Sequence, residues 1–228
     1  MASSPHSTVS AVIFDVDGTM IDNHRFHFDA WVILGKGLGI EITPELYATT
    51  MNSRTNADIL RDLLGSQTPL EQINELELKK EALYRDLYAP HLALREGLLE
   101  LLDQFAAAGI PLAAASNAPR ENVDFAFEKL GIQDRFLATV TYKDVLKGKP
   151  DPEMFLLAAK KLERRAEECL IFEDSPSGIR AARSSGAAFI IIDNPALKDL
   201  PDVHAGALAI VDGYRDAKLF TALRHIGF

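Results

Sequence analysis

Short apolar runs alternate along this chain with stretches of helical period, and this alternation restricts the fold. The apolar runs fall at residues 12–14, 110–115, 170–172 and 188–192. Helical patterns lie between them at residues 98–108, 121–130 and 153–162. Apolar strands separated by amphipathic helices form βαβ units, in which helices cover both faces of a parallel sheet. The pattern predicts an α/β fold with a doubly wound, mainly parallel sheet and a Rossmann-like core.

One segment breaks the alternation. Residues 22–95 contain no convincing strand, and helical stretches fall at residues 24–38, 44–51, 56–64 and 70–88. Because this block stands between the first strand and the helix before the second, we expect an inserted α-helical cap domain over residues 22–95. Residues 1–21 and 96–228 then form the α/β core catalytic domain.

Polar side chains follow the apolar runs at once. Asp15-Val16-Asp17-Gly18-Thr19 follows the first run, Ser116-Asn117 the second, Glu173-Asp174-Ser175 the third and Asp193-Asn194 the fourth. In open α/β sheets, ligands bind beyond the carboxyl ends of the strands. The acids, hydroxyl and amide are therefore expected to gather at one edge of the sheet, which is the first indication of a site.

The acidic residues of this edge favour a metal ion. Asp15 and Asp17 point the same way if the strand stays extended, and two carboxylates so close need a cation or a proton between them. Glu173-Asp174 ends another strand, with Ser175-Pro176 as the predicted N-cap and first residue of the next helix. Oxygen-rich clusters of this kind suit Mg²⁺, which binds carboxylates, water and phosphate oxygens.

Phosphoryl transfer also needs positive charge and hydrogen-bond donors around the phosphate. Lys149 precedes Asp151-Pro152, the predicted cap and first residue of a helix, so it lies in a loop from which it can point inward. Ser116 supplies a hydroxyl. Each residue alone has an ordinary structural interpretation, but their order along the strand ends favours a shared catalytic site.

Charge and composition narrow the partners. The formal net charge of −9 argues against a nucleic-acid or anionic-membrane surface. Cys169 is the only cysteine, so an internal disulfide is excluded. Residues 1–10 lack the pattern of a signal peptide, and the densest apolar run, residues 187–192, is too short to span a membrane. We expect a cytoplasmic protein that acts on a small phosphorylated metabolite, and nothing in the sequence indicates an obligate protein partner.

The combined motifs resemble the haloacid dehalogenase superfamily. Asp15-Val16-Asp17-Gly18-Thr19 is similar to its first motif, Ser116 to its second, Lys149 to its third and Glu173-Asp174 to its fourth. The position and size of the helical insertion look like the cap of the β-phosphoglucomutase-like branch. Further matches to that branch are His27-Phe28-x-Ala30-Trp31 and Asn52-Ser53-Arg54.

The resemblance implies a role for each matched residue. Asp15 would attack phosphorus and form an aspartyl-phosphate, and Asp17 would act as general acid and base. Mg²⁺ would be held by Asp15, the Asp17 carbonyl and Asp174, with Glu173 nearby. The implied contacts with substrate or its phosphate come from Ser116, Asn117 and Lys149 and, in the cap, from Arg54 and His27, the latter as a hinge or proton relay.

Two outcomes share the first chemical step. A phosphatase lets water attack the aspartyl-phosphate, whereas a mutase lets a sugar-phosphate hydroxyl attack. Asp17 favours phosphate-ester chemistry, because the dehalogenases of the family lack that acid and its phosphonate hydrolases replace it. His27 and Arg54 favour β-phosphoglucomutase, but the mutase pattern has a Lys-Asn pair where this chain has Pro119-Arg120. Arg120 can still bind a second anion. We favour a sugar-phosphate phosphatase, with the mutase as the alternative.

A binding module that has kept the fold and lost turnover is a third hypothesis, disfavoured because the catalytic residues are all present. Other features have simpler interpretations. Lys79 and Lys80 are predicted to lie on an exposed helix face, and Cys169 is predicted to be inert packing. Gly35-Lys36-Gly37-Leu38-Gly39 lacks the dinucleotide-binding spacing and is predicted to be a helix end and loop.

Overall fold

The computed structural model describes residues 9–51, 54–198 and 200–228, and they form two compact units. The core unit contains the described residues up to Asp22 together with Ala93–Phe228. The helical unit is Asn23–Leu92. The inserted segment thus begins at Asn23 and ends at Leu92, against the predicted limits of 22 and 95.

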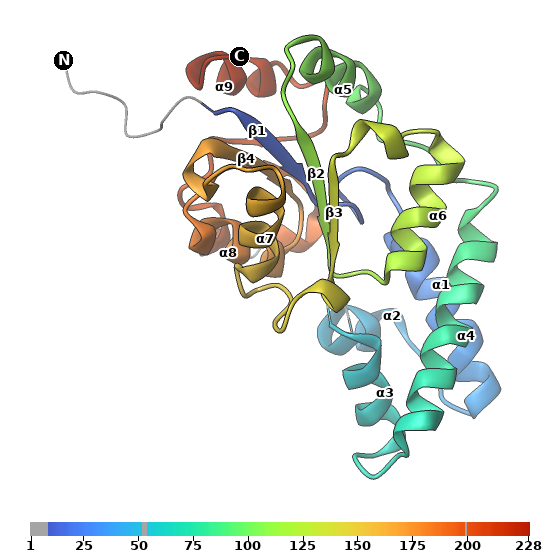
Figure 1. Ribbon diagram of the computed structural model, residues 1–228. Coiled ribbons are helices and arrows are strands. Elements are labelled where there is room, and N and C mark those ends of the chain that lie inside the picture. Colours follow the sequence, from blue (N-terminus) through green and yellow to red (C-terminus); the bar gives the residue numbers. More distant parts are fainter. Residues whose placement is uncertain (1–8, 52–53, 199) are drawn as a thin grey trace. The chain divides into compact units, whose positions relative to one another are not determined.

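The core unit is built on a six-stranded sheet whose strand order is β3-β2-β1-β4-β5-β6, with every neighbouring pair parallel (Figure 1). The strands are β1 (Ala11–Phe14), β2 (Leu112–Ser116), β3 (Ala138–Thr141), β4 (Cys169–Glu173), β5 (Ala188–Ile192) and β6 (Ala209–Val211). This order is that of doubly wound nucleotide-binding sheets. The predicted fold class is confirmed.

The order of the strands creates a switch point beside β1. The chain runs outward from β1 to β2 and β3, then returns to the other side of β1 with β4. Ile13 consequently pairs with Ala113 on one side and with Ile171 on the other. The connections leaving β1 and β4 diverge at such a point, and ligands bind in the crevice between them.

Five α-helices of the core unit lie within the described residues, and the bounds of the first three, whose ranges were predicted, agree with the sequence patterns to within about a residue. They are α5 (Leu98–Ala107), α6 (Arg120–Leu130), α7 (Glu153–Lys161), α8 (Pro176–Ser185) and α9 (Ala217–His225). Short 3₁₀ turns occur at Gln133–Arg135, Tyr142–Asp144, Ala166–Glu168, Pro195–Leu197 and Pro201–His204. As predicted, Ser175 caps α8 through its hydroxyl and Pro176 is its first residue. Helix α7 begins at Glu153, as its helical pattern predicted, so Pro152, predicted as its first residue, is its N-cap instead.

The two faces of the sheet bury different side chains because strand residues alternate. Ile13 and Ile171 face a hydrophobic cluster that includes residues of α7 and α8. Phe14 faces the opposite way, where its ring stacks on Phe172 with centroids 4.7 Å apart and meets Phe105 at 6.4 Å. Both faces are thus covered, and polar chemistry is confined to the strand ends.

The helical unit contains α1 (His24–Leu38), α2 (Pro44–Leu46), α3 (Asn56–Leu64) and α4 (Leu70–Tyr88), with a π-helical turn at Tyr47–Met51. Three of these match the predicted bounds, whereas the stretch 44–51 is a short α-helix followed by the π-turn rather than one helix. A separate apolar cluster that includes Trp31 and Leu60 forms the core of this unit. The C-cap of helix α1 is Gly39, whose φ of 73° lies in the left-handed region. Glycine adopts this conformation easily because it has no Cβ to clash with the backbone.

The prediction for Lys80 was wrong. Lys79 is exposed, but Lys80 is 2% exposed. Its Nζ lies 2.8 Å from His27 Nδ1 and donates to Glu81 Oε1 at 2.9 Å, and it stands over the Trp31 ring. A buried ammonium group is tolerated only when it is paired in this way.

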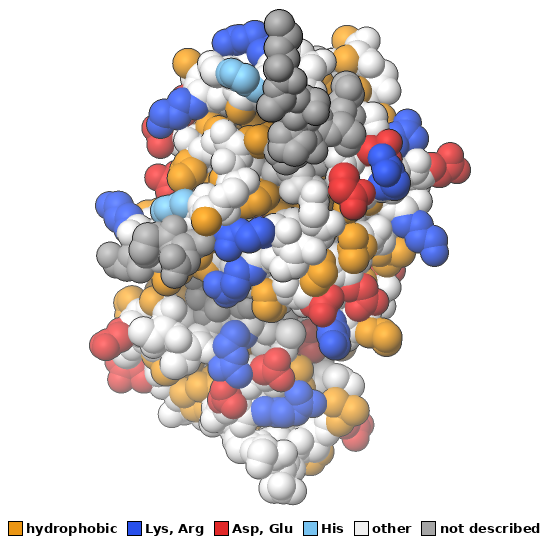
Figure 2. Space-filling view, turned by 90° about the vertical axis from the view of Figure 1, so that its left-hand side faces the viewer, with side chains coloured by type: hydrophobic (Ala, Val, Ile, Leu, Met, Phe, Trp, Pro, Cys, Tyr) orange, Lys and Arg blue, Asp and Glu red, His pale blue; other side chains and the backbone are white. Residues whose placement is uncertain are grey.

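Charged side chains of both signs are interspersed over the face drawn in Figure 2. In the described part of the chain, no helix has the length and apolar character needed to cross a bilayer. Cys169, the first residue of β4, is buried, and burial raises the pKa of its thiol to about 12, as expected for inert packing.

Candidate functional site

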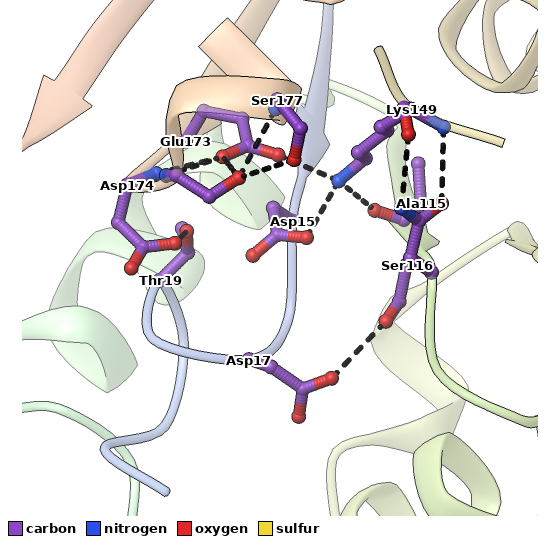
Figure 3. Close-up of polar contacts among 12 residues, drawn as sticks. Asp15, Asp17, Thr19, Ala115, Ser116, Lys149, Glu173, Asp174 and Ser177 are labelled. Atoms are coloured by element: carbon purple, nitrogen blue, oxygen red, sulfur yellow. Dashed lines mark hydrogen bonds and ion pairs between the residues drawn. The ribbon is translucent and has the colours of Figure 1, made fainter. Parts of the chain in front are cut away.

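Three strand ends beside the switch point supply the polar side chains of the site (Figure 3). Asp15 follows the last residue of β1, and its backbone N–H donates to Phe172 O of β4 at 3.0 Å. Ser116 is the last residue of β2 and Glu173 the last of β4, followed by Asp174. The parallel sheet brings these residues to one edge, as the sequence predicted.

Lys149 lies among them. Its Nζ donates to Asp15 Oδ1 at 2.6 Å, to Glu173 Oε1 at 2.6 Å and to Ala115 O at 2.9 Å. Burial by itself lowers the pKa of this amine, but the two carboxylates outweigh burial and raise it above its ordinary value. Lys149 therefore stays charged, and it fixes the orientation of Asp15.

Asp15 is only 6% exposed. Burial raises the pKa of its carboxyl well above the ordinary value, and the neighbouring Glu173 raises it further, against the lowering effect of Lys149. Asp174 and Asp17 add smaller effects in the same direction as burial. One buried lysine does not balance this group of acids, so a further cation would lower the electrostatic cost.

The donor set suits a divalent cation. Asp15, Glu173 and Asp174 each place a carboxylate oxygen within 4.8 Å of the others, and all three are buried. Hard oxygen ligands of this number match the preference of Mg²⁺, which keeps water or substrate oxygens at its other positions. The Asp17 side chain is not one of this trio and is half-exposed.

Glu173 holds the loop at the end of β4. Besides Lys149 on Oε1, its Oε2 accepts from Asp174 N at 2.8 Å, Ser175 N at 2.9 Å and Ser175 Oγ at 3.1 Å. Gly178 in the first turn of α8 makes this arrangement fit, because a Cβ there would lie 1.6 Å from Glu173 Oε1. The sequence analysis did not single out Gly178, although a glycine so early in a capped helix is a usable signal.

Asp17 turns toward β2. Ser116 Oγ donates to Asp17 Oδ2 at 3.3 Å and accepts from Ala118 N at 3.0 Å. Gly18 has φ of 84°, so the chain can turn directly after Asp17, and Gly18 N donates to Ile21 O at 2.8 Å. The two aspartates therefore have different partners, Lys149 for Asp15 and Ser116 for Asp17.

A family model of haloacid dehalogenase-like hydrolases matches residues 9–186, a span that includes every one of these side chains. The chain belongs to this family. The resemblance stated from the motifs is confirmed, and the protein is an enzyme of the haloacid dehalogenase-like hydrolase type.

Named relatives include two phosphatases. The phosphorylated carbohydrates phosphatase of Thermotoga maritima is 30% identical over 207 residues, which are 89% of this chain and 94% of that protein. The chloroplastic 5-amino-6-(5-phospho-D-ribitylamino)uracil phosphatase of Arabidopsis thaliana is 30% identical over 171 residues, which are 75% of this chain and 46% of that protein. This chain thus spans about half the length of the second relative.

A solved β-phosphoglucomutase from Clostridium difficile has the same fold, with a TM-score of 0.81. It is 23% identical, and the match covers 95% of this chain and 98% of that one. At this identity the likeness shows the fold alone, and it agrees with the resemblance to the β-phosphoglucomutase-like branch.

In this haloacid dehalogenase-like hydrolase, the carboxamide of Asn117 brackets the backbone of Lys149. Asn117 Oδ1 accepts from Lys149 N at 3.1 Å, and Asn117 Nδ2 donates to Lys149 O at 3.4 Å. These side-chain contacts hold the loop that carries the lysine, and the predicted contact of Asn117 with the phosphate stays a prediction. A Cβ at Gly148 would lie 2.8 Å from Asn117 Oδ1, so the glycine permits the close approach.

Asp174 has partners that the sequence analysis missed. Thr19 Oγ1 donates to its Oδ1 at 3.1 Å, and Asn194 Nδ2 donates to its Oδ2 at 2.9 Å. Asn194 follows β5, and Tyr214 follows β6 and donates from its hydroxyl to Thr19 O at 3.0 Å. The sequence placed Asp193-Asn194 at a strand end directly after an apolar run, but the contact of Asn194 with Asp174 was not predicted.

Two predicted site residues belong to the helical unit. His27 stacks on Tyr84 with centroids 3.9 Å apart, and its Nδ1 lies beside Lys80 Nζ. Arg54 donates from Nη1 to Asp62 Oδ2 at 2.7 Å and to Thr50 O at 2.9 Å. The neighbouring motif residues Asn52 and Ser53 lie outside the described residues.

Arg120, considered above as a second anion-binding group, lies in the core unit. Its Nη2 donates to Asp144 Oδ2 at 2.8 Å and to Thr139 O at 2.9 Å. The guanidinium is therefore engaged by a protein carboxylate, which disfavours the role of Arg120 as a phosphate-binding replacement for the lysine of the mutase pattern.

Proposed function

We propose that this enzyme is a Mg²⁺-dependent phosphatase of a small sugar phosphate or similar phosphorylated metabolite, working through an aspartyl-phosphate on Asp15. The observation that carries the proposal is the ion pair of Asp15 with Lys149, set beside a second acid, Asp17, at the switch point of the sheet. A fixed nucleophile, a cation for phosphate oxygens and a separate acid–base group are the parts that phosphoryl transfer requires.

In the first step, a carboxylate oxygen of Asp15 attacks phosphorus, and the bond from phosphorus to the ester oxygen breaks. Asp17 gives its proton to that leaving oxygen. Lys149 keeps Asp15 in position and offsets negative charge on the phosphoryl oxygens as the bond order changes.

In the second step, water attacks phosphorus and gives its proton to Asp17. The bond from phosphorus to Asp15 breaks, which restores the carboxylate and releases inorganic phosphate. The half-exposed position of Asp17 and its contact with Ser116 suit a group that exchanges protons with substrate and water. Ser116, at the end of β2, is assigned to the phosphate as well.

The assigned ligands of Mg²⁺ are Asp15, the Asp17 carbonyl and Asp174. When bound, the ion neutralises charge on the phosphate and on the cluster of acids. Glu173 is assigned a supporting place, because Lys149 and the loop donors already occupy its two oxygens. Glu173 is thus assigned to Lys149, Asp174 to the metal, and Asp15 to both.

β-Phosphoglucomutase is the second candidate, favoured by the cap residues His27 and Arg54 of that branch. The substrate class of the first proposal rests on the named relative from Thermotoga maritima, a phosphatase of phosphorylated carbohydrates. The engagement of Arg120 by Asp144 counts against the mutase.

A panel of phosphorylated sugars tests the proposal, with phosphate release measured in Mg²⁺ and in EDTA. A coupled assay of β-glucose 1-phosphate isomerisation runs alongside. We expect Mg²⁺-dependent phosphate release on at least one sugar phosphate and little isomerisation. Isomerisation faster than phosphate release would replace the phosphatase by the mutase, and no turnover in either assay would favour the binding module.

A further inference from the structure

We propose that Asn194 is a positioning residue that holds Asp174 in the orientation needed to bind the metal. The inference rests on the proposed Mg²⁺-dependent function and adds a residue from outside the span 9–186 that the family model matches. It concerns residues of the core unit alone.

Asn194 makes two contacts with Asp174 from a single nitrogen. Its Nδ2 lies 2.5 Å from the backbone oxygen of Asp174 and 2.9 Å from Asp174 Oδ2. A primary amide carries two hydrogens on this atom, so it can serve both acceptors at once. The peptide and the carboxylate of Asp174 are thereby tied to one group, which fixes the side-chain torsions between them.

Few side chains could replace this contact. An aspartate at position 194 has no donor when ionised and would add charge beside Asp174, and a serine has one donor in place of two. A lysine or arginine would donate, but its positive charge would compete with a metal cation. The neutral amide orients the carboxylate and leaves its negative charge for the metal.

The two carboxylates at the end of β4, Glu173 and Asp174, differ in the charge of the donors that hold them. Glu173 pairs with the cation Lys149 at 2.6 Å, whereas the donors to Asp174 named above, Thr19 and Asn194, are neutral. A carboxylate already paired with an ammonium group gains less from a metal ion than one held by dipoles. These contacts agree with Glu173 as a partner of Lys149 and with Asp174 as a metal ligand.

The other oxygen of Asp174 is held from the opposite side of the switch point. Thr19, in the loop after β1, donates to Asp174 Oδ1 at 3.1 Å, and the Tyr214 hydroxyl donates to Thr19 O at 3.0 Å. The loops after β1 and β5 thus donate directly to one carboxylate, and the loop after β6 supports it through Thr19. Outer contacts of this kind orient metal ligands, and their loss typically lowers metal affinity by about 10–100-fold.

The test measures Mg²⁺ binding without substrate. Asn194→Ala removes both donors, and Asn194→Ser restores one. The matched control is Asp193→Asn, a nearly isosteric change at the exposed preceding residue. With Mg²⁺ affinity determined by calorimetry, we expect the Kd to rise by about 10–100-fold in Asn194→Ala, by less in Asn194→Ser and by less than twofold in the control.

Steady-state kinetics separate positioning from substrate binding. In Asn194→Ala the Mg²⁺ concentration for half-maximal activity should rise with the Kd. The KM for p-nitrophenyl phosphate at saturating Mg²⁺ should stay within about threefold of wild type, because Asn194 is assigned no substrate contact. A Kd within twofold of wild type, or a change confined to KM, would overturn the proposal.

Two further outcomes are distinguishable. If Asn194→Ala does not fold, Asn194→Ser is tested in its place. A Kd for Mg²⁺ within twofold of wild type in Asn194→Ser would then overturn the proposal. If the wild type itself binds no Mg²⁺, the proposed function fails and this inference fails with it. If the wild type binds Mg²⁺ and turns over while both variants bind it equally well, only the positioning role fails.

Discussion

At the scale of single residues, Asp15 is the most demanding assignment, since it must be a nucleophile and a metal ligand together. We expect Asp15→Asn to lower kcat for p-nitrophenyl phosphate by about 10⁴-fold or more, because an amide is a poor nucleophile and a poor ligand. Circular dichroism should show an unchanged fold, since the substitution is nearly isosteric. Turnover above about 1% of wild type would contradict the nucleophile assignment.

The same substitution has an effect on stability that depends on pH. The folded pKa of Asp15 is raised above 3.8 by burial and then by Glu173. A carboxyl raised in this way favours the folded state below its unfolded pKa, and this contribution is lost as the pH rises through the folded pKa. In EDTA at neutral pH, Asp15→Asn should therefore raise Tm by about 3 °C, corresponding to roughly 1 kcal/mol.

The difference in Tm between Asp15→Asn and wild type should shrink as the pH falls toward the unfolded pKa, because Asp15 then becomes protonated in both states. Asp193→Asn, at an exposed position, serves as the control and should show little pH dependence. A lower Tm for Asp15→Asn in EDTA at neutral pH would mean that the pair with Lys149 stabilises the fold more than burial of the acid destabilises it.

Which residues would gather at the site was predictable, but several of their contacts were not. Asp15, Lys149 and Glu173 come together because strand ends of a parallel sheet share an edge, a property of the fold that the sequence pattern reveals. The contacts of Asn117 and Asn194 depend on how two loops distant in sequence approach each other. Neither hydrophobic period nor local motif carries that information.

At the scale of helices and strands, the start of α8 is packed closely against Glu173. Gly178 N donates to Ser175 Oγ, and a Cβ on Gly178 would overlap Glu173 Oε1 and Cδ, at 1.6 and 1.9 Å. Gly178→Ala should therefore displace Glu173 and with it Lys149. We expect a loss of about 1–3 kcal/mol in the free energy of unfolding and at least about a tenfold fall in kcat.

Gly109→Ala is a control for Gly178→Ala on stability, since a Cβ at Gly109 has open space and its cost comes from φ of 68° alone. Urea unfolding and phosphatase assays measure both variants. If Gly178→Ala keeps wild-type activity and stability, the close packing of α8 on Glu173 is not required by the site.

The loop after β6 gives a second prediction at this scale. Tyr214→Phe removes the hydroxyl that donates to Thr19 O while keeping the ring against Phe172, where the centroids lie 5.8 Å apart. The expected cost is about 1 kcal/mol of stability, measured by urea unfolding, for one buried hydrogen bond.

Phe14→Leu, a change to the ring packing alone, should leave the Mg²⁺ requirement unchanged, whereas Tyr214→Phe should raise it modestly. Equal Mg²⁺ requirements in the two variants would contradict the link from Tyr214 to the metal ligands.

Helix limits were predicted closely because caps and apolar periods are local. Helices α1, α3 and α4 have the predicted bounds. Strands β3 and β6 were missed, since β3 alternates Ala and Val with Thr and β6 has only three residues. A short strand at the edge of a sheet is specified by its partner more than by its own sequence.

At the scale of the whole molecule, the net charge of −9 is unfavourable for binding an anion. The charge is spread over interspersed side chains on the face drawn in Figure 2, while the site concentrates acids around one lysine. A phosphate dianion is attracted to such a site only when further positive charge is present. The overall charge and the local cluster therefore lead to the same requirement for a bound cation.

Removing the metal tests this requirement on the intact protein. EDTA should abolish phosphatase activity, and Mg²⁺ should restore it. Mg²⁺ at about 100 times its Kd should stabilise the folded state by roughly 2.7 kcal/mol. For a chain of this size that corresponds to a rise in Tm of about 5–10 °C, measured against NaCl at matched ionic strength.

Ca²⁺ separates binding from catalysis in the same experiment. It accepts the same oxygen ligands but prefers more of them at longer distances, so it should raise Tm while supporting little turnover. The distinction follows from the proposal that Asp15 is both metal ligand and nucleophile, because it could not attack phosphorus if a larger ion drew it further into its ligand shell. Asp174→Asn should lose most of the Tm rise with both ions, since Asp174 is assigned to the metal alone. Full activity in EDTA, or an equal Tm rise in Asp174→Asn, would contradict the metal assignment. The repulsion among the acids of the switch point would then have to be relieved by protonation of one of them.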